Sequence, residues 1–393
     1  MVEILYFMKI CLINNLYKPF NRGGAEKVCE TIAAGLQQAG HEVFIITTKP
    51  NKKLRVASCE LRVYYLNSLY YNLSKLPKFL RLFWQICNLF NFTSYFKIKK
   101  ILRKEKCGAV ITNNLMGIGF LTARAIRKLK IKHLHIAHDI QLIHPSGLMY
   151  YGEEGIINGF FAKIYFSLCR WLFNSPATVI FPSRWLKDLY VSRKFFRQSK
   201  IEILPNPVDA APERASEPDG NFKFLFLGQI EKHKGVFLLL EAFNKIREKY
   251  SEAELILAGG GSQIEKARRQ AAGNNNIKFL GWPGDERADE LLGAVNCLVY
   301  PSLVYENCPN AIQRVLAAGL PVLASNLGGI PELLSGEGGV LFKPADAGDL
   351  TEKMAWVIKN KNNLSALIKA GERKAPAFKS ENYIKELEEM IEL

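Results

Sequence analysis

The stretch of residues 300–332 constrains the fold of this chain more than any other part of it. An apolar run at residues 294–299 predicts a buried strand, and a helical pattern begins near Asn310 and ends at Gly319. A second short apolar strand follows at residues 321–324. A helix between two closely spaced strands is typical of a parallel sheet, because parallel strands need a crossover. The stretch therefore predicts an α/β domain.

Groups that could bind a ligand fall at one edge of this predicted sheet. Glu306 lies in the crevice outside the carboxyl end of a strand. The backbone amides of Cys308, Asn310 and Ala311 lie at a helix N-terminus. A carboxylate accepts hydrogen bonds from sugar hydroxyls, and amides at a helix N-terminus donate to phosphate. The pattern therefore predicts a site for a ligand that carries both groups.

The same alternation of strands and helices runs through both halves of the 393-residue chain, which is long enough for two domains. Strands are expected at residues 10–14, 43–47, 109–112, 133–137, 178–181 and 201–204, and again at 222–227, 255–258 and 277–280. A helix is expected at residues 235–250. Pro205, Pro207 and Pro212, with the polar run 213–220, predict a linker. We therefore expect domains at residues 1–208 and 209–375, followed by a C-terminal helix at 376–393.

The net charge of +16 is carried by the first half of the chain. Residues 1–210 contain 31 Lys and Arg against 12 Asp and Glu, a net of +19, and residues 211–393 contain 22 against 25, a net of −3. Such an asymmetry indicates that one half faces a polyanion. Residues 69–106 mix basic and aromatic side chains, which suits an anionic membrane surface, where each basic residue contributes about 1 kcal/mol. The alternative is a core helix with solvated lysines, and no fold signature of nucleic-acid binding accompanies it.

Cysteine spacing and hydropathy bear on the compartment. The eight cysteines form no Cys-x-x-Cys and no paired Cys/His spacing, which argues against a zinc site and favours a reducing cytoplasm. Residues 1–15 are typical of a first strand rather than a signal peptide, and no run reaches the roughly 18 apolar residues that span a bilayer. We expect a cytoplasmic protein without a metal, peripheral on the inner face of the cell membrane.

The motifs of the second half resemble those of the retaining glycosyltransferases called group 1 or family 4. That family has a Glu, then a Pro, a second Glu and a small-small-Gly turn, followed by Gly-Gly-x-Pro-Glu. Glu306 matches the first Glu, residues 317–319 match the turn and residues 328–332 match the last motif, whereas Arg314 replaces the second Glu. The resemblance covers nearly the whole chain. It implies the GT-B fold, with two Rossmann-like domains facing each other across a cleft and a last helix that often returns to the first domain.

The resemblance implies a donor site built mainly from the second domain. Lys234 matches a Lys that binds the donor diphosphate, and Glu306 matches a Glu that hydrogen-bonds the donor sugar. Further donor-binding positions are Gly24, Gln229, Gly260, Trp282, Cys308, Pro309, Asn310, Ala311 and Arg314. The alternatives are a solvated lysine at a helix start and an acid that favours the helix dipole.

Two departures from the family pattern affect the expected chemistry. The second Glu of the family accepts hydrogen bonds from the nucleotide ribose, whereas Arg314 only donates. Gln229 stands where the family has an Arg and removes a positive charge. Three readings stay open: the ribose is held differently, Arg314 points at phosphate and compensates for Gln229, or donor binding is lost.

The first domain is expected to contribute a glycine loop and a histidine. Gly23 and Gly24 lie in the turn before the first helix and match the family's first-domain glycine loop, and Arg22 beside them is expected to contact phosphate or acceptor. His138 is expected directly after the strand at 133–137, facing the donor sugar or its phosphate. Three other histidines lie within a few residues, so a structural histidine is the alternative.

Together these features predict a glycosyltransferase in which Glu306, His138 and Lys234 are the catalytic residues. It would move a sugar from a UDP- or GDP-linked donor, without any other cofactor, to a lipid-linked or membrane-surface glycan in polysaccharide or cell-envelope synthesis. Nucleic acid is not an expected partner. Two alternatives are a catalytically weakened binding protein of the same fold, indicated by Gln229 and Arg314, and a sugar-nucleotide epimerase.

Overall fold

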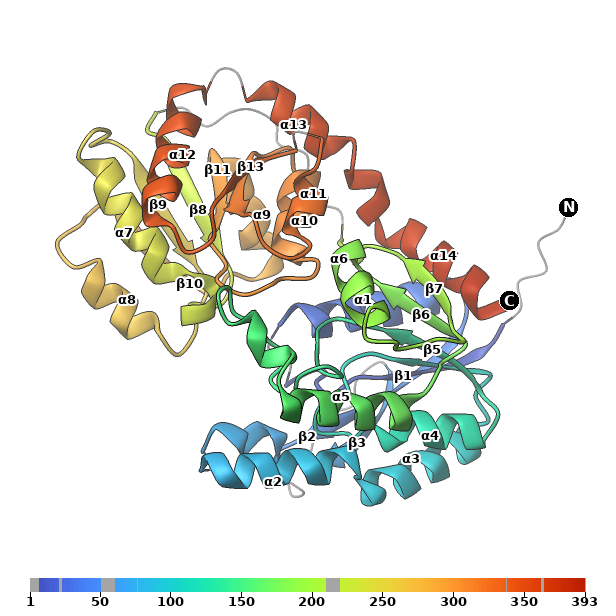
Figure 1. Ribbon diagram of the computed structural model, residues 1–393. Helices are drawn as coiled ribbons and strands as arrows, with labels where there is room; N and C mark the ends of the chain where they lie inside the picture. The colour runs from blue at the N-terminus through green and yellow to red at the C-terminus, as the bar shows by residue number, and fades with distance from the viewer. Residues whose placement is uncertain are drawn as a thin grey trace, which may run out of the picture. The chain divides into compact units, whose positions relative to one another are not determined.

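The computed structural model describes residues 7–20, 23–50, 61–75, 77–209, 220–336, 338–361 and 364–392. The chain divides into two compact units, each built on a parallel sheet (Figure 1). Unit 1 comprises Met1–Leu148, Gly155–Pro207 and Ser380–Leu393, and unit 2 comprises Met149–Glu154 and Val208–Lys379. The predicted class of two Rossmann-like α/β domains is confirmed.

The strands of unit 1 form one sheet whose described members run in the order β3-β2-β1-β4-β5-β6-β7. Their bounds are β1 Lys9–Ile13, β2 Glu42–Lys49, β3 Arg62–Asn67, β4 Ala109–Thr112, β5 Lys132–Ile136, β6 Thr178–Phe181 and β7 Lys200–Ile203. Apolar residues fill the central strands because helices cover both faces of a parallel sheet. The order reverses between β1 and β4, and open α/β sheets bind ligands at such points, outside the carboxyl ends of the strands.

Helices of unit 1 cover the two faces of this sheet (Figure 1). They are α1 Gly24–Gln38, α2 Lys78–Leu89, α3 Phe92–Glu105, α4 Leu121–Lys128, α5 Phe160–Phe173, α6 Arg184–Val191 and α14 Ser380–Glu392, with the 3₁₀ turns η1 Leu69–Lys75 and η2 Glu154–Ile157. On one face α14 packs against α1, and Ile384 and Leu387 join the core that includes Ile32 and Leu36. On the other face α4 packs against both α3 and α5.

Unit 2 has a second parallel sheet whose described strands follow the order β10-β9-β8-β11-β12-β13. These strands are β8 Lys223–Leu227, β9 Glu254–Ala258, β10 Ile277–Gly281, β11 Cys297–Tyr300, β12 Val322–Ser325 and β13 Val340–Phe342. The helices are α7 Val236–Arg247, α8 Ile264–Gln270, α9 Asp285–Ala294, α10 Asn310–Ala317, α11 Ile330–Leu334, α12 Ala347–Lys359 and α13 Ser365–Glu372, with η3 Lys232–Lys234 and η5 Ala375–Phe378.

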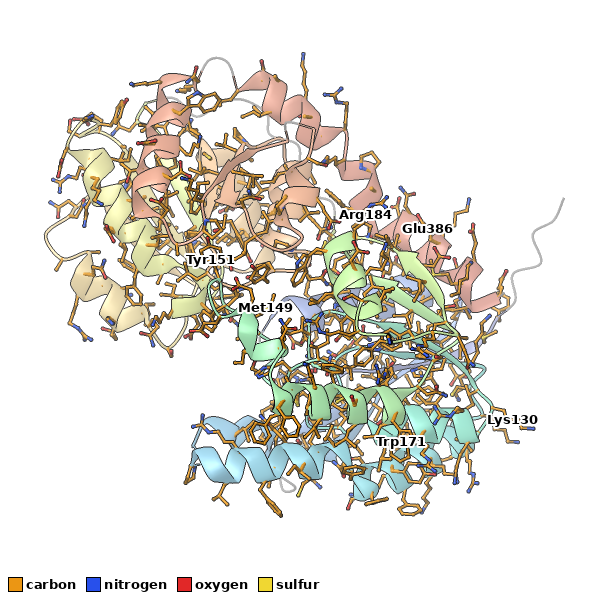
Figure 2. The ribbon with its side chains drawn as sticks, in the orientation of Figure 1. Lys130, Met149, Tyr151, Trp171, Arg184 and Glu386 are labelled. Carbon is orange, nitrogen blue, oxygen red and sulfur yellow. The ribbon has the colours of Figure 1, made fainter. Side chains whose placement is uncertain are left out.

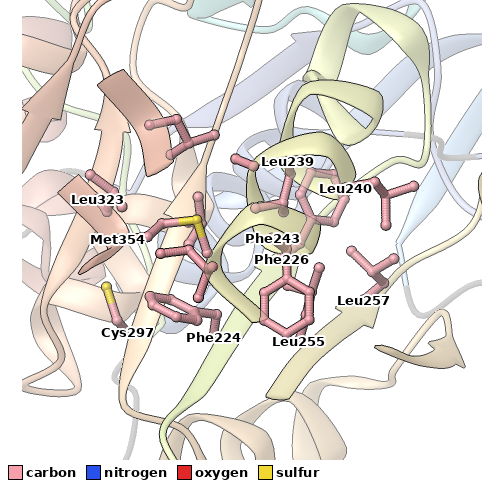
Figure 3. Close-up of a cluster of buried hydrophobic side chains, with 14 of the residues drawn as sticks. Phe224, Phe226, Leu239, Leu240, Phe243, Leu255, Leu257, Cys297, Leu323 and Met354 are labelled. Carbon is pink, nitrogen blue, oxygen red and sulfur yellow. The ribbon is translucent and has the colours of Figure 1, made fainter. Parts of the chain in front are cut away.

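Side-chain alternation along β8 supplies both cores of unit 2. Phe224 and Phe226 point to one face of the sheet, where they join Phe243 of α7 and Met354 of α12 in the cluster of Figure 3. Leu225 points to the other face and joins the core that includes α10. This alternation follows from the two-residue period of a strand.

A short piece from the first half of the sequence belongs to unit 2. Met149–Glu154 forms an antiparallel bridge between Tyr150 and Val304. The amide of Tyr305 donates to the carbonyl of Met149 at 2.9 Å, and its hydroxyl donates to the Glu154 carboxylate at 2.7 Å. The loop after β11 is thereby tied to residues far away in sequence.

Two expectations from the sequence need correction or lie outside the structure, and two strands were missed. The helix expected at 235–250 is shorter, since α7 spans Val236–Arg247, and it begins one residue later because Gly235 has a φ of 75° and separates η3 from α7. The strands β3 and β13 were not predicted. Of the expected linker, residues 210–219 lie outside the described part of the chain.

Candidate functional site

A partly buried ion pair joins two predicted site residues of unit 2. Lys234 follows β8 and Glu306 follows β11, and these two strands are neighbours in the parallel sheet. Their carboxyl ends therefore lie at the same edge. The Nζ of Lys234 donates to the Oε1 of Glu306 at 2.7 Å, and the two side chains are 22% and 16% exposed.

The electrostatics of this pair keep both groups charged. Burial by itself would raise the pKa of Glu306, but the charge and hydrogen bond of Lys234 outweigh it and hold that pKa below its usual value. Burial would likewise lower the pKa of Lys234, and the carboxylate of Glu306 raises it instead. A fixed ammonium and a fixed carboxylate thus lie side by side at the end of the sheet.

Two side chains that the sequence did not single out complete this cluster. Tyr300, the last residue of β11, has its hydroxyl 3.4 Å from the Nζ of Lys234. The Oγ of Ser302 lies 3.1 Å from the Oε1 of Glu306. Burial, followed by the charge of Glu306, raises the pKa of Tyr300, so the phenol stays protonated. Neither residue belonged to a motif, although Tyr300 directly follows the apolar run at 294–299 and Ser302 lies two residues later.

Glycines without room for a side chain fix the positions of the loop that carries Lys234 and the loop that carries Glu306. A Cβ on Gly235 would lie 1.7 Å from the carbonyl oxygen of Pro301, so only glycine lets the Lys234 turn cross the loop after β11. A Cβ on Gly328, which has a φ of 65°, would lie 2.2 Å from the carbonyl oxygen of Glu306. The amide of Gly329 donates to that same oxygen at 2.8 Å. The Gly-Gly motif therefore supports the backbone of Glu306.

The helix α10 begins four residues after Glu306. Pro309 is its N-cap and supplies no side-chain hydrogen bond to the first amides, which belong to Asn310 and Ala311. Cys308 is buried in the core below. The predicted helix N-terminus is therefore present, and the partial positive charge of such an end favours an anion.

Arg314 and Gln229, the two positions that depart from the family pattern, both lie in unit 2. Arg314 on α10 forms an ion pair with Asp289 of α9, with its Nη2 2.6 Å and its Nε 3.1 Å from Oδ1. Gln229 follows Gly228 at the end of β8, and its carbonyl accepts from the amide of Glu231. Asp289 is a partner that sequence reasoning missed, because it lies within an ordinary polar helix pattern.

The remaining donor-site predictions of unit 2 lie in neighbouring turns. Gly260 follows β9, and its carbonyl accepts from the amide of Ile230 at 2.9 Å. Trp282 follows β10 and is 63% exposed. These turns end β9 and β10, which succeed β8 toward one edge of the sheet.

Unit 1 carries a second polar cluster at the carboxyl ends of its central strands. The Nε2 of His138 lies 2.8 Å from the Oδ1 of Asn113, which follows β4. The amide of Asn114 donates to the Oδ1 of Asn14, which follows β1. The side-chain nitrogen of Asn114 donates to Asp139 at 2.9 Å. The sequence pointed to His138 but not to Asp139 or to these asparagines.

The position of His138 differs slightly from the prediction. The strand β5 ends at Ile136, so Ala137 is the first residue after it and His138 is the second. Burial lowers the pKa of His138 to about 4, which leaves the ring neutral at pH 7. The neutral ring can donate from Nε2 to the Oδ1 of Asn113. Burial raises the pKa of the adjacent Asp139 to about 6.

The glycine loop of unit 1 opens α1 as predicted, with Gly23 as N-cap and Gly24 as the first helical residue. The amide of Gly23 donates to the carboxylate of Glu26 at 2.6 Å. Arg22 lies outside the described residues. Within the described residues no three His, Cys, Asp or Glu side chains are grouped as a metal site would require. No helix there combines the length and hydrophobicity needed to cross a bilayer.

Known families match both halves of the chain. The family described as Glycosyltransferase Family 4 matches residues 22–211, and the one described as Glycosyl transferases group 1 matches residues 208–374.

Individual relatives and structures are similar over different lengths. An uncharacterized 42.6 kDa protein in the cps region of Klebsiella pneumoniae is 25% identical over 332 residues, which cover 83% of this chain and 87% of that protein. The phosphatidyl-myo-inositol mannosyltransferase of Mycobacterium leprae is 30% identical over 165 residues, covering 40% of this chain and 44% of that enzyme. Among solved structures, Anabaena HepE in complex with UDP-glucose has a TM-score of 0.73 at 17% identity, covering 98% of this chain and 99% of that chain.

Proposed function

Because the chain belongs to the glycosyltransferases of the group 1 and family 4 type, which have the GT-B fold, we propose that it transfers a sugar from a nucleoside-diphosphate sugar with retention of the anomeric configuration. The observation that carries this proposal is the partly buried pair of Lys234 and Glu306 beside the N-terminus of α10. One site thereby combines a fixed cation, a fixed carboxylate and helix amides.

Each part of this site has a role in the proposed reaction. The ammonium of Lys234 and the first amides of α10 stabilise the diphosphate as it leaves with negative charge. The carboxylate of Glu306 accepts hydrogen bonds from hydroxyls of the donor sugar and orients it. We assign a neutral His138 to hydrogen bonding with the sugar or its phosphate. A UDP- or GDP-linked donor is proposed, and the complex of HepE with UDP-glucose supports the choice of UDP.

We further propose a lipid-linked or membrane-surface glycan as acceptor, used in polysaccharide or cell-envelope synthesis at the inner face of the cell membrane. The basic first half of the chain supports this, since it carries a net charge of +19 from 31 cations and 12 anions in residues 1–210. The relative encoded in a Klebsiella cps region and the mannosyltransferase that acts on phosphatidyl-myo-inositol point in the same direction.

A panel of UDP- and GDP-sugars tests the proposal. A true donor at 100 times its Kd should stabilise the protein by about 2.7 kcal/mol, visible as a thermal shift, and should yield free nucleoside diphosphate with an acceptor extract. The variants Glu306→Gln and Lys234→Met should lower turnover at least about a hundredfold. Absence of both shift and turnover for every donor would reject the proposal, and an inverted anomer in the product would reject retention.

A second candidate is a binding protein of the same fold with weakened catalysis. The ion pair between Arg314 and Asp289 favours it, because a guanidinium already engaged with a carboxylate stands where the family has a ribose-binding Glu. Donor binding without any transfer or hydrolysis would support this candidate over an active enzyme. The variant Arg314→Glu would then show whether Arg314 contacts phosphate. It should weaken binding of the diphosphate only if that contact exists.

A further inference from the structure

Four helices of unit 1 are basic and almost free of acidic residues. α2, α3, α4 and α5 carry twelve Lys and Arg in their sequences: Lys78, Arg81, Lys97, Lys99, Lys100, Arg103, Lys104, Arg124, Arg127, Lys128, Lys163 and Arg170. Their one acidic residue is Glu105, whose side chain is 3% exposed. Glu105 binds Lys9 and Arg62, so it does not offset the outward charge. The solvent side of these helices is therefore positively charged.

The same helices expose large apolar side chains at helical spacing. On α5, Phe160 and Phe161 are 72% and 84% exposed, and Ile164 and Trp171 continue the stripe along the helix. On α2 the stripe consists of Leu80, Phe83 and Ile86, and on α3 of Phe92 and Phe96. A monomeric soluble protein rarely leaves several aromatic stripes in water, so such surfaces mark an interaction site.

The stripes of α3 and α5 belong to one continuous layer. α4 packs against both helices, and the guanidinium of Arg124 on α4 lies over the ring of Trp171 at 5.7 Å. Figure 2 labels Trp171 on α5, with α4 running beside it. A cation of α4 and an aromatic ring of α5 are thus in contact within this layer.

We propose that the face formed by α3, α4 and α5 binds the interfacial region of an anionic bilayer, with Phe160, Phe161 and Trp171 inserted among the headgroups. Aromatic rings prefer that depth, and lysines and arginines around them attract anionic lipids. The inference deepens the proposed function, on which it rests for the choice of a lipid surface, because a lipid-linked acceptor is found there.

Charge and shape favour a bilayer over two other possible partners of this face, a second copy of the chain and a nucleic acid. A second copy of this chain would bring the same cationic face against itself in a twofold dimer, and like charges would repel. Nucleic acid would match the cations, but long apolar stripes along helices are not the stacking platforms of single-strand binders. A bilayer interface accepts both the cations and the apolar stripes.

Vesicle flotation with the full chain tests this surface. The protein should float with vesicles of phosphatidylcholine and phosphatidylglycerol, less with phosphatidylcholine alone, and less at high salt. The triple variant F160S/F161S/W171S should bind the anionic vesicles at least about tenfold more weakly. A second variant, K97E/K100E/K104E, should lose only the preference for anionic vesicles. The matched control is Trp356→Ser, which removes an aromatic ring that is 45% exposed on α12 of unit 2 and should bind like the wild type.

The outcomes separate this inference from the proposed function. Failure of the wild type to float with anionic vesicles, equal flotation of the triple variant, or binding to single-stranded DNA instead of vesicles would each overturn the inference. Donor turnover in detergent-free solution should be unchanged in the triple variant, because its residues lie outside the donor site. Absence of donor turnover in the wild type would instead reject the proposed enzymatic activity, and it would leave the proposed lipid-binding surface untouched.

Discussion

Lys234 and Glu306 depend on each other for their charge state. Each holds the pKa of the other in the direction that keeps both ionised, against the effect of burial. Because the pKa of Glu306 is lowered, its contribution to stability is present above the usual pKa of 4.5 and is lost as pH falls through the lowered value. The pKa of either group therefore cannot be interpreted without the other group.

Removing one partner should therefore cost more than removing both. Lys234→Met leaves the partly buried carboxylate of Glu306 uncompensated, and we expect it to lower the free energy of unfolding by about 2 kcal/mol, less than for a fully buried pair because some water reaches the site. Glu306→Gln should cost a similar amount, and the double variant should cost less than either single variant. Urea unfolding of the four proteins measures the coupling. Strictly additive costs would show that the pair contributes no mutual stabilisation.

Asp139 predicts a pH dependence of the opposite sign. Burial raises its pKa from 3.8 to about 6, so its contribution to stability is fully present below pH 3.8 and is lost as pH rises through 6. Relative to Asp139→Asn, the wild type should gain about 1–3 kcal/mol of unfolding free energy between pH 7 and pH 4. Chemical unfolding of both proteins across that range measures the difference, and a difference that does not change with pH would contradict the raised pKa.

At this scale the sequence identified individual residues but not their partners. Lys234 and Glu306 were predicted separately, because each follows an apolar run and lies in a motif. Their contact required the order of the sheet, in which β8 and β11 are neighbours although two strands separate them in sequence. Asp289 lies on a polar helix and gave no local signal for its pairing with Arg314.

At the scale of elements, the turn at Gly328 determines where Glu306 lies. Gly328→Ala would add a Cβ 2.2 Å from the carbonyl oxygen of Glu306, and we expect donor affinity to fall at least about tenfold as that loop shifts. Gly336→Ala is the matched control, because Gly336 has nearly the same φ, 66°, with nothing within 4 Å of the added atom. Calorimetric titration with the donor found in the panel measures both. Equal losses of donor affinity in the two variants would show that backbone strain alone causes the effect.

Elements were predicted well where apolar runs were fully buried and poorly at the edges of the sheets. The strands β4 and β6 have the predicted bounds, and every residue in them is buried. β3 is an edge strand whose residues are mostly half-buried, and β13 has three residues, so neither produces a clear pattern. Helix starts shifted where a glycine turn intervenes, as at Gly235, because the left-handed backbone is not visible in the hydrophobic period.

At the scale of the molecule, charge and binding chemistry separate between the two halves of the sequence. The second half, with its net charge of −3 in residues 211–393, carries the pair of Lys234 and Glu306. The first half carries the cations and the exposed aromatic layer. Composition alone predicted this asymmetry. It did not predict the stripe on α5, since that helix lies outside the basic stretch that stood out in the sequence.

The chain passes between the units four times, after Leu148, Glu154, Pro207 and Lys379. The last passage places α14 in unit 1, where Leu387 is fully buried in the core shared with α1. On a ribosome, α14 emerges only after all of unit 2. Domains generally fold as units in the order of synthesis. Here unit 1 cannot complete its fold before unit 2 has been synthesised, because the apolar face of α1 that packs against α14 stays uncovered throughout translation of unit 2. Premature termination within unit 2 would therefore leave both units unfinished.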